Sequence, residues 1–335
     1  IRPFLEKKHL LSYLEAILRI YNLYGRRDNK YKARIKILVR EEGINEIKQR
    51  VETEWALIKD KLELSAERIS EIQAQFTPPE YQTGAAQDTS YADNTTNSAD
   101  FATWVKHNTA EHKMDGYRAV YVSLKAPDSP PGDCTHTQLD AIADLADQYS
   151  FGMARVTHRQ NLVLADIKQA DLFAVWQKLD ALNCATPNIG KATDMICCPG
   201  LDYCGLANAG SIGVAQEIND MLDSMDYVHD LGDLKINISG CMNGCAHQSV
   251  GHIGILGVDK KGVEWYQVTL GGSSENDAAI GDRLGPAVSK EDITPTIKIL
   301  LEVYIEQRLN EEESFLATVR RVGVAPFKEK TYATH

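Results

Sequence analysis

Apolar residues recur at helical spacing near the start of the chain. They predict a helix from Lys8 to Tyr24 whose apolar face comprises Leu10, Leu11, Leu14, Ile17, Leu18 and Tyr21. Gly25 follows, and we expect it to end this helix in the left-handed conformation that glycine tolerates best. A second helix, rich in charged residues, is predicted from Gly43 to Leu62.

The stretch from 77 to 100 changes character. It is polar, poor in aliphatic residues and rich in Pro, Gly, Thr, Asn and Asp. This composition is typical of loops. We therefore expect a linker or long loop between domains here.

The region 101–183 carries two alternating patterns. Alternation with period two predicts a strand at 116–124 and a strand or hairpin at 153–167. Helical spacing predicts helices at 137–149 and 171–182. Strand, helix, strand and helix in this order predict a compact layer of α+β structure.

The C-terminal region, 184–335, repeats both patterns. We predict a helix at 213–225 and a strand from Leu234 to Ser239 that leads directly to Cys241. A hairpin is predicted from the apolar runs 252–258 and 263–270.

The last predicted elements are helical. Thr294 followed by Pro295 resembles a cap with proline in the first turn, so we expect a helix from there to about Leu309. A further helix is predicted from Glu311 to Arg321, followed by an extended tail.

Composition is that of an ordinary globular protein. The chain has 335 residues, 43% of them hydrophobic and 25% charged, which is enough for two or three domains. No apolar run approaches the roughly 18 residues that a membrane helix needs, and no secretory signal is visible. We expect a cytoplasmic protein that binds no membrane, and the net charge of −11 argues against nonspecific nucleic-acid binding. The absence of an initiator Met suits a processed, truncated or fragmentary chain.

Four of the seven cysteines form two close pairs. Cys198 and Cys204 enclose five residues, whereas Cys241 and Cys245 enclose three. Disulfides are disfavoured in a chain without an export signal. Four cysteines in two glycine-bounded pairs also argue against purely structural, buried thiols.

Two kinds of inorganic centre remain. Four cysteines suit structural zinc, but zinc pairs usually enclose about two to four residues. An iron–sulfur cluster accepts four thiolates with more varied loops, so the spacing favours a cluster, with zinc as the alternative. Glycines at 200, 205, 240 and 244 suit a cluster because backbone amides approach its sulfides closely.

The segment 26–40 is basic within an acidic chain. It has seven basic residues and one acidic residue. A solvated charged face explains such a run most simply. The other interpretation is a site for a polyanion, since Arg and Lys pair with carboxylates and phosphates.

These motifs together resemble the sulfite and nitrite reductase hemoproteins. The double cysteine motif resembles the signature by which this family holds a [4Fe–4S] cluster and a siroheme that share one thiolate. Further similarity lies at 24–36, 155–162, 251–257, 265–272 and 321–328. The likeness covers nearly the whole chain except the predicted linker.

The resemblance implies roles for the cysteines. Cys198, Cys204, Cys241 and Cys245 correspond to the cluster ligands, and Cys245 to the bridging, axial ligand of siroheme iron. Cys197 competes with Cys198 but would lengthen the first gap, so we expect it to be a buried neighbour. Cys134 and Cys184 receive no role.

The resemblance also implies a siroheme environment. Siroheme carries eight carboxylates, so the basic segment supplies its candidate partners: Arg27, Lys30, Arg34 and Lys36. Arg155 and Gln160 are further candidates, although a packing and hydrogen-bonding role suits them equally. Asn243 is expected to shape the turn between Cys241 and Cys245. His247 and His252 are expected to be structural.

The implied fold is α+β, the C-terminal part of a pseudo-twofold repeat. Residues 1–76 correspond to the end of a first siroheme domain, 77–100 to a linker, 101–183 to a ferredoxin-like half-domain, and 184–335 to the siroheme and cluster domain. The Arg and Lys residues that grip sulfite belong to the first repeat and are absent from this chain. We therefore expect this chain alone not to bind substrate properly.

The implied activity is six-electron reduction of sulfite to sulfide in sulfur assimilation. The motifs at 251–257 and 264–272 resemble bacterial assimilatory sulfite reductases most. Nitrite reduction to ammonia is the alternative within the family, and a zinc-stabilised binding module without redox activity is the alternative outside it. The electron donor is either a flavoprotein subunit that uses NADPH or a ferredoxin.

Overall fold

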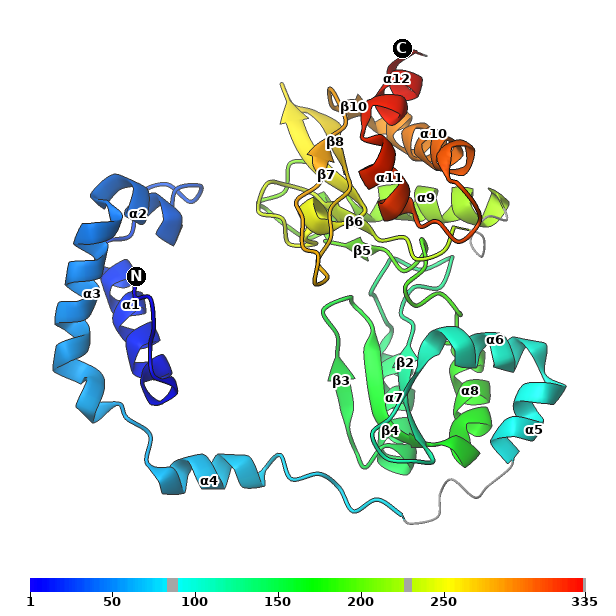
Figure 1. Cartoon of the computed structure of the whole chain (residues 1–335), viewed down its shortest axis with the longest axis horizontal. Helices are drawn as coiled ribbons and strands as arrows, with labels where there is room; N and C mark the ends of the chain where they lie inside the picture. Colours follow the sequence, from blue (N-terminus) through cyan, green and yellow to red (C-terminus); the bar gives the residue numbers. More distant parts are fainter. Residues whose placement is uncertain (83–89, 226–230, 334–335) are drawn as a thin grey trace. The chain divides into compact units, whose positions relative to one another are not determined.

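The computed structural model describes residues 1–82, 90–225 and 231–333. They form two compact units, Ile1–Glu80 and Tyr81–His335, and each is described by itself (Figure 1). Within the described residues, no helix is both long and apolar enough to cross a membrane.

The first unit is a small helical assembly. Its core forms where α1 and α3 pack against each other, with Tyr13, Ala16 and Ile20 from α1 and Val51 and Trp55 from α3 all buried. The elements of this unit are η1 (Lys7–His9), α1 (Leu10–Tyr24), α2 (Ile35–Glu42), α3 (Ile44–Ile58), η2 (Lys59–Lys61) and α4 (Ala66–Ala74).

The predicted apolar face of α1 is wrong, because most of it is exposed. Leu10, Leu11, Leu14 and Leu18 are exposed, with Leu18 at 58%. The buried face lies around Tyr13 instead, whose ring packs edge-on against Trp55 at 5.3 Å. The indole of Trp55 also donates to the Ser12 hydroxyl at 3.0 Å. A polar and aromatic contact therefore selects the face, and leucine spacing alone does not reveal it.

Gly25 ends α1 as predicted, but not in the left-handed conformation. Its φ of −66° and ψ of 142° are extended. A Cβ at this position would lie 2.5 Å from the Tyr21 carbonyl oxygen. Glycine is therefore needed here because a side chain would clash with the Tyr21 carbonyl, and not because the backbone is left-handed.

The second unit begins with a half-domain built on a four-stranded antiparallel sheet of order β1-β2-β4-β3. The strands are β1 (Thr109–Glu111), β2 (Tyr117–Val122), β3 (Ala154–Val156) and β4 (Leu162–Lys168). The helices are α5 (Ser90–Asn97), α6 (Ala99–Asn108), α7 (His136–Tyr149) and α8 (Leu172–Ala181), with η4 (Gln169–Asp171) before the last. Val120 and Val122 of β2 and Leu164 and Ile167 of β4 are buried in one core with residues of these helices.

The predicted linker is partly wrong, because its second half is helical. Helix α5 lies inside 77–100, and Tyr91 packs against the core of the half-domain. The polar composition concealed it because only a few residues make this contact. The first half includes Tyr81, whose hydroxyl donates to Asp166 at 2.7 Å, whereas 83–89 lie outside the described residues.

The cysteine domain follows and has a mixed sheet of order β10-β8-β7-β6-β5, with β9 paired to β8. Strand β6 runs parallel to both β5 and β7, and the other pairs are antiparallel. The strands are β5 (Ile196–Cys197), β6 (Ile236–Ser239), β7 (Ile253–Lys260), β8 (Val263–Leu270), β9 (Asp282–Arg283) and β10 (Val288–Ser289). The short turns are η5 (Gly200–Asp202) and η6 (Gln248–Val250).

In the part of this domain that the structure describes, the helices are α9 (Ile212–Met225), α10 (Lys290–Gln307), α11 (Phe315–Val322) and α12 (Ala325–Ala333). Helix α10 contacts each of the other three (Figure 1). Strand β6 is paired on both sides, with β5 and with β7, and all four of its residues are buried. Cys241 therefore follows a fully buried strand, with Gly240 between them.

Two predictions for the C-terminal helices are wrong. Helix α10 begins at Lys290, capped by Ser289, and Pro295 lies inside it. Proline removes one backbone hydrogen bond there, but burial of Ile293 and Ile297 on either side stabilises the helix through it. The expected extended tail is helix α12, where Phe327 is buried.

The cap of α10 can be tested by stability measurements. The Ser289 hydroxyl accepts the Asp292 amide at 3.3 Å, so Ser289→Ala is expected to lower the free energy of unfolding by about 1 kcal/mol. Thr294→Ala is the matched control, since Thr294 makes only an exposed contact with Glu217, and it should change stability by less than about 0.5 kcal/mol. Chemical denaturation of both variants measures this, and the reverse order would place the helix start at Thr294.

Candidate functional site: the cysteine loops

The first cysteine loop leaves the sheet at strand β5. The Cys198 amide donates to the Ile238 carbonyl at 3.0 Å and so continues the parallel pairing of β5 with β6. In return, the Gly240 amide donates to the Cys198 sulfur at 3.0 Å. The Cys198 thiol therefore lies beside the residue that precedes Cys241.

The two cysteine loops are in direct backbone contact. The Gly240 carbonyl accepts from the amides of Asn208 at 2.8 Å and Ala209 at 3.1 Å. A Cβ on Gly240 would lie 2.7 Å from the Ala209 oxygen and 2.9 Å from the Gly200 Cα. Gly200 itself has a φ of +57°, and a Cβ there would meet the Ser211 amide at 2.6 Å. Both glycines are needed because the loops touch, whereas a Cβ on Gly205 would meet nothing within 4 Å.

The second loop turns sharply between its cysteines. Gly244 donates to the Cys241 carbonyl at 3.1 Å and has a φ of +67°. Cys241 is buried, whereas Cys245 is exposed. Asn243 lies in this turn and is exposed. The turn directs its two thiols into different environments.

Large apolar side chains next to the cysteines are exposed. Tyr203, which precedes Cys204, is 80% exposed, and Met242, which follows Cys241, is 78% exposed. Exposed apolar groups of this size often mark a surface that binds a ligand or partner.

All seven cysteines are free thiols, so no disulfide joins the pairs. Within the described residues, no three His, Cys, Asp or Glu side chains converge tightly enough to hold one metal ion. A four-iron cluster binds each thiolate to a different iron, so its four ligands need not converge on a single ion. Four thiols on two glycine-containing loops that contact each other through their backbones fit the ligands of such a cluster.

The other cysteines are unsuited to ligation. Cys197 is buried, as expected, and burial raises the pKa of its thiol. Burial also raises the pKa of Cys184, to about 11. Since the thiolate is the form that binds metal, these surroundings disfavour both residues as ligands.

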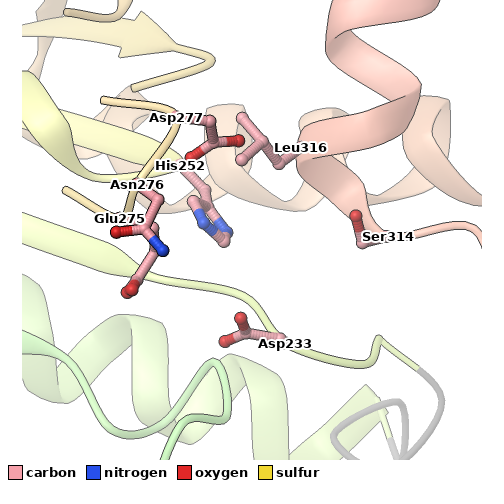
Figure 2. Close-up of a pocket in the computed structure, with 7 residues that line it drawn as sticks. All are labelled: Asp233, His252, Glu275, Asn276, Asp277, Ser314 and Leu316. Atoms are coloured by element: carbon pink, nitrogen blue, oxygen red, sulfur yellow. The ribbon is translucent and has the colours of Figure 1, made fainter. Parts of the chain in front are cut away.

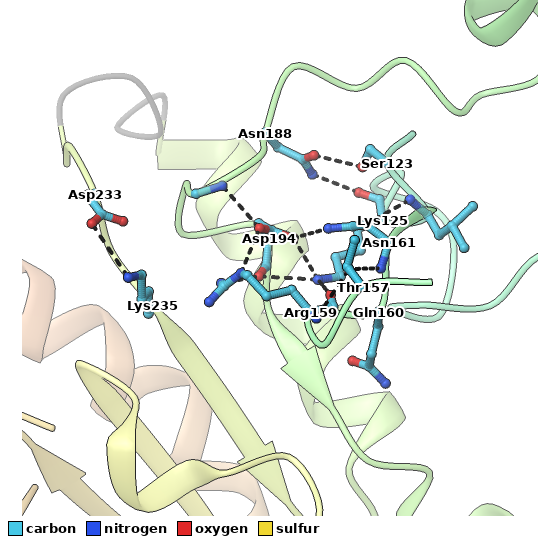
Figure 3. A network of polar contacts seen from close by, with 12 residues as sticks. Ser123, Lys125, Thr157, Arg159, Gln160, Asn161, Asn188, Asp194, Asp233 and Lys235 are labelled. Atoms are coloured by element: carbon cyan, nitrogen blue, oxygen red, sulfur yellow. Dashed lines mark hydrogen bonds and ion pairs between the residues drawn. The ribbon is translucent and has the colours of Figure 1, made fainter. Parts of the chain in front are cut away.

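A buried polar network joins the half-domain to the segment 194–198, which carries Cys198 and is called the cysteine arm (Figure 3). At its centre is Asp194, which pairs with Lys125 at 2.6 Å and with Arg159 at 3.2 Å. The side chains of Asp194 and Lys125 are both fully buried. Asn161 donates to the same carboxylate at 2.9 Å, and the Gly190 amide donates to it at 3.0 Å.

The network shifts the ionisation of Asp194. Burial alone would raise the pKa of this carboxyl, but the charges of Lys125 and Arg159 outweigh it and hold the pKa below its ordinary value. Sequence reasoning missed Lys125 and Asp194. A Lys and an Asp so far apart in sequence show no periodicity, and only the position of Asp194 shortly before the cysteines hints at its role.

The candidate siroheme residues lie in different places. Gln160 contacts the backbone of Cys197 through both atoms of its amide, at 2.7 and 2.8 Å. Arg155 is exposed on β3, opposite Val163. Of the two roles considered for Gln160, a siroheme contact and a packing and hydrogen-bonding role, the structure shows the hydrogen bonds of the second.

The four basic candidates lie in the first unit. The Arg27 guanidinium lies over the Tyr21 ring at 4.8 Å, and the Lys30 amine lies near the Tyr31 ring at 5.1 Å. Arg34 donates to the Ala33 carbonyl at 3.0 Å, and Lys36 is exposed. The structure describes this unit by itself, so the role of these residues toward a siroheme stays a prediction.

His252 is a buried histidine with a backbone partner. Its Nδ1 accepts the Lys235 amide at 3.2 Å, and burial lowers its pKa. Its ring lines a pocket of about 310 Å³, and Figure 2 shows it there with Asp233 and Glu275. His247 adopts a left-handed turn conformation with φ +53°. Neither geometry requires more than a structural role.

Comparison with known families decides the kind of protein. The nitrite/sulfite reductase ferredoxin-like half domain matches residues 111–182. The nitrite and sulphite reductase 4Fe-4S domain matches residues 1–59 and 191–335, more than half of the chain. The chain belongs to this family. The predicted α+β fold, with a ferredoxin-like half-domain and a 4Fe-4S domain, is thereby confirmed.

Individual relatives are distant. The chain is 24% identical over 312 residues to the assimilatory ferredoxin-dependent nitrite reductase of Haloferax mediterranei, covering 90% of this chain and 48% of that protein. It is 29% identical over 278 residues to sulfite reductase [ferredoxin] 2 of Mycolicibacterium paratuberculosis, covering 80% and 43%. The structure of the Mycobacterium tuberculosis NirA protein matches with a TM-score of 0.61 and 26% identity, covering 94% and 53%. The chain thus spans about half the length of these relatives.

Removing the charge of Asp194 tests the buried network. Asp194→Asn leaves Lys125 and Arg159 without their counter-charge and is expected to lower the free energy of unfolding by about 3–5 kcal/mol. Asp233→Asn is the control, because Asp233 is 60% exposed and 3.9 Å from Lys235, and it should change stability by at most about 1 kcal/mol. Equal effects in urea denaturation would contradict a central role for Asp194.

The same residue predicts a pH dependence. Because the folded-state pKa of Asp194 is depressed, its contribution to stability is complete above the ordinary carboxyl pKa of about 4. It is lost as the pH falls through the lower folded-state pKa. Unfolding free energies measured from neutral to acid pH should therefore fall less steeply in Asp194→Asn than in the wild type.

Proposed function

We propose that this chain is the cluster-bearing part of a siroheme-dependent sulfite reductase. The reaction is the six-electron reduction of sulfite to sulfide. The observation that carries the proposal is the contact of the two cysteine loops at Gly200 and Gly240, in a chain that belongs to a 4Fe-4S family.

Cys198, Cys204, Cys241 and Cys245 are the proposed cluster ligands. The amide of Gly240 already donates to the Cys198 sulfur, and a hydrogen bond of this kind stabilises a thiolate and raises the reduction potential of a cluster. A bound [4Fe–4S] cluster supplies one-electron transfer, and the siroheme supplies the site of sulfite reduction. The chain itself would place the thiolates, donates a backbone hydrogen bond to that of Cys198 and holds the two loops together.

Cys245 is the proposed shared ligand of cluster and siroheme. It is the exposed cysteine of its pair, so its thiol is accessible to a large cofactor. Exposed Met242 in the same turn, and exposed Tyr203 next to Cys204 on the other loop, offer apolar contacts for such a cofactor. Asn243 lies in the same turn and keeps its proposed part in the cofactor environment.

The carboxylates of siroheme call for cations. Arg27, Lys30, Arg34 and Lys36 are the proposed partners from the first unit. Exposed Arg155 is a weaker proposal, because nothing in its surroundings points to the cysteines.

Nitrite is the second candidate substrate. It is favoured by the similarity to a nitrite reductase across 90% of the chain, whereas similarity to sulfite reductases and the motifs at 251–257 and 264–272 favour sulfite. The relatives' names also include ferredoxin-dependent and NADPH-dependent enzymes, so both donors remain proposals for this chain.

Substrate and donor are tested together in the full-length protein. Steady-state rates with sulfite and with nitrite are measured with a ferredoxin and with an NADPH flavoprotein. We expect a higher kcat/KM for sulfite; a higher value for nitrite would reverse the assignment. A purified protein with bound zinc and no visible absorption would exclude redox function altogether.

Replacing Cys245 tests the shared ligand. Cys245→Ser in the full-length protein is expected to abolish coupling between cluster and siroheme and to lower sulfite turnover at least tenfold, since the thiolate bridge is lost. Cys134→Ser is the control because Cys134 lies outside both loops. Absorption spectra, EPR spectra and sulfite turnover are measured for both variants. Unchanged turnover in Cys245→Ser would contradict the assignment of Cys245 as the shared ligand.

A further inference from the structure

The turn between β3 and β4 has an unusual residue at its tip. Gln160 adopts a φ of +59°, a conformation that is unfavourable for a residue with a side chain and easy for glycine. Gly132 leaves space for the Gln160 side chain. Any other residue at position 132 would place its Cβ 2.8 Å from the Gln160 Cβ, which is too close. An unfavourable conformation that packing maintains calls for an explanation.

The side chain of Gln160 supplies that explanation. Its Oε1 accepts the Cys197 amide at 2.8 Å, and its Nε2 donates to the Cys197 carbonyl at 2.7 Å. Strand β5 is the last strand of its sheet and pairs with β6 on one side only. The Gln160 amide satisfies the other side as a neighbouring strand would.

This contact fixes the peptide that leads to Cys198. Its carbonyl, from Cys197, is held by Gln160, and its amide, from Cys198, is held by Ile238 at 3.0 Å. The plane of this peptide is thus bonded on both sides. The direction in which the Cys198 thiol leaves the backbone depends on that plane.

The flanking residues hold Gln160 in position. Arg159 and Asn161 both bind the Asp194 carboxylate, whereas the Gln160 side chain points away from it (Figure 3). The turn is therefore anchored by its neighbours and contacts the cysteine arm through Gln160. No siroheme contact is needed to account for this residue.

We propose that Gln160 is a positioning residue for the iron–sulfur cluster. Its amide holds Cys197 and thereby directs the Cys198 thiolate toward the cluster. The proposal rests on the proposed cluster site and assigns to the half-domain a part in retaining the cluster.

Two variants separate the amide from the backbone conformation. Gln160→Gly removes the amide and relieves the unfavourable φ. Gln160→Glu keeps the shape but, when ionised, presents only acceptors and so cannot donate to the Cys197 carbonyl. Gln138→Ala is the matched control, because Gln138 also lies in the half-domain and also donates its amide to a backbone carbonyl, that of Leu182, at 2.8 Å.

The experiment uses the full chain, reconstituted with iron and sulfide under reducing conditions. Cluster loss to a chelator is followed by visible absorption, the reduced cluster is examined by EPR, and thermal unfolding is recorded for the cluster-free proteins. We expect Gln160→Gly, which loses both hydrogen bonds, to lose the cluster about tenfold faster than wild type, and Gln160→Glu, which loses one of them, to lose it faster than wild type as well. Their EPR spectra should also change, whereas Gln138→Ala should match the wild type in both.

The possible failures are distinguishable. A wild-type chain that assembles no cluster would refute the proposed function and this proposal with it. A wild-type chain that holds its cluster while both Gln160 variants behave identically to it would refute the positioning role alone. Cluster loss that follows thermal stability across all variants, with unchanged EPR spectra, would also overturn the positioning role, since Gln160 would then be merely structural.

Discussion

The carboxylate of Asp194 is the interaction on which the second unit depends. It lies where the half-domain meets the arm that carries Cys198, and it binds Lys125 and Arg159 at once. Burying a charge is unfavourable unless its partners are in place. The network is therefore satisfied only when both parts of the unit have folded and docked, so the cysteine arm takes up its position in a completed half-domain.

The second requirement is the contact between backbones at Gly200 and Gly240. Distant sequence segments can bring cysteines together only if the loops between them occupy little volume. Here glycine provides that space, and the parallel strands β5 and β6 bring both loops to the same edge of the sheet. Family membership then gives the contact its chemical meaning, because the matched 4Fe-4S domain includes both loops.

How much the sequence predicts depends on the range of the contacts involved. Local periodicity located β2, α7, β7 and β8 closely, and the spacing of the cysteines drew attention to the right loops. Local sequence patterns gave wrong or missing predictions where a residue far along the chain determines which face is buried or which charge is paired. The buried face of α1 is selected by Trp55, helix α10 continues through Pro295 because its flanks are buried, and Asp194 meets Lys125 from far along the chain. The motif at 155–162 identified Gln160 as a candidate, but nothing in the sequence indicated that its side chain contacts the backbone of Cys197.

The closure of strand β5 by a side chain has a consequence for how a cofactor enters. A full neighbouring strand would have to separate along its whole length to free the outer edge of β5, whereas the Gln160 amide is released by breaking two hydrogen bonds. Such a local opening requires far less free energy than global unfolding. The outer edge of β5 can therefore open and reclose locally while its pairing with β6 and the Asp194 network stay in place, so the position of the Cys198 thiol can adjust as the proposed cluster binds.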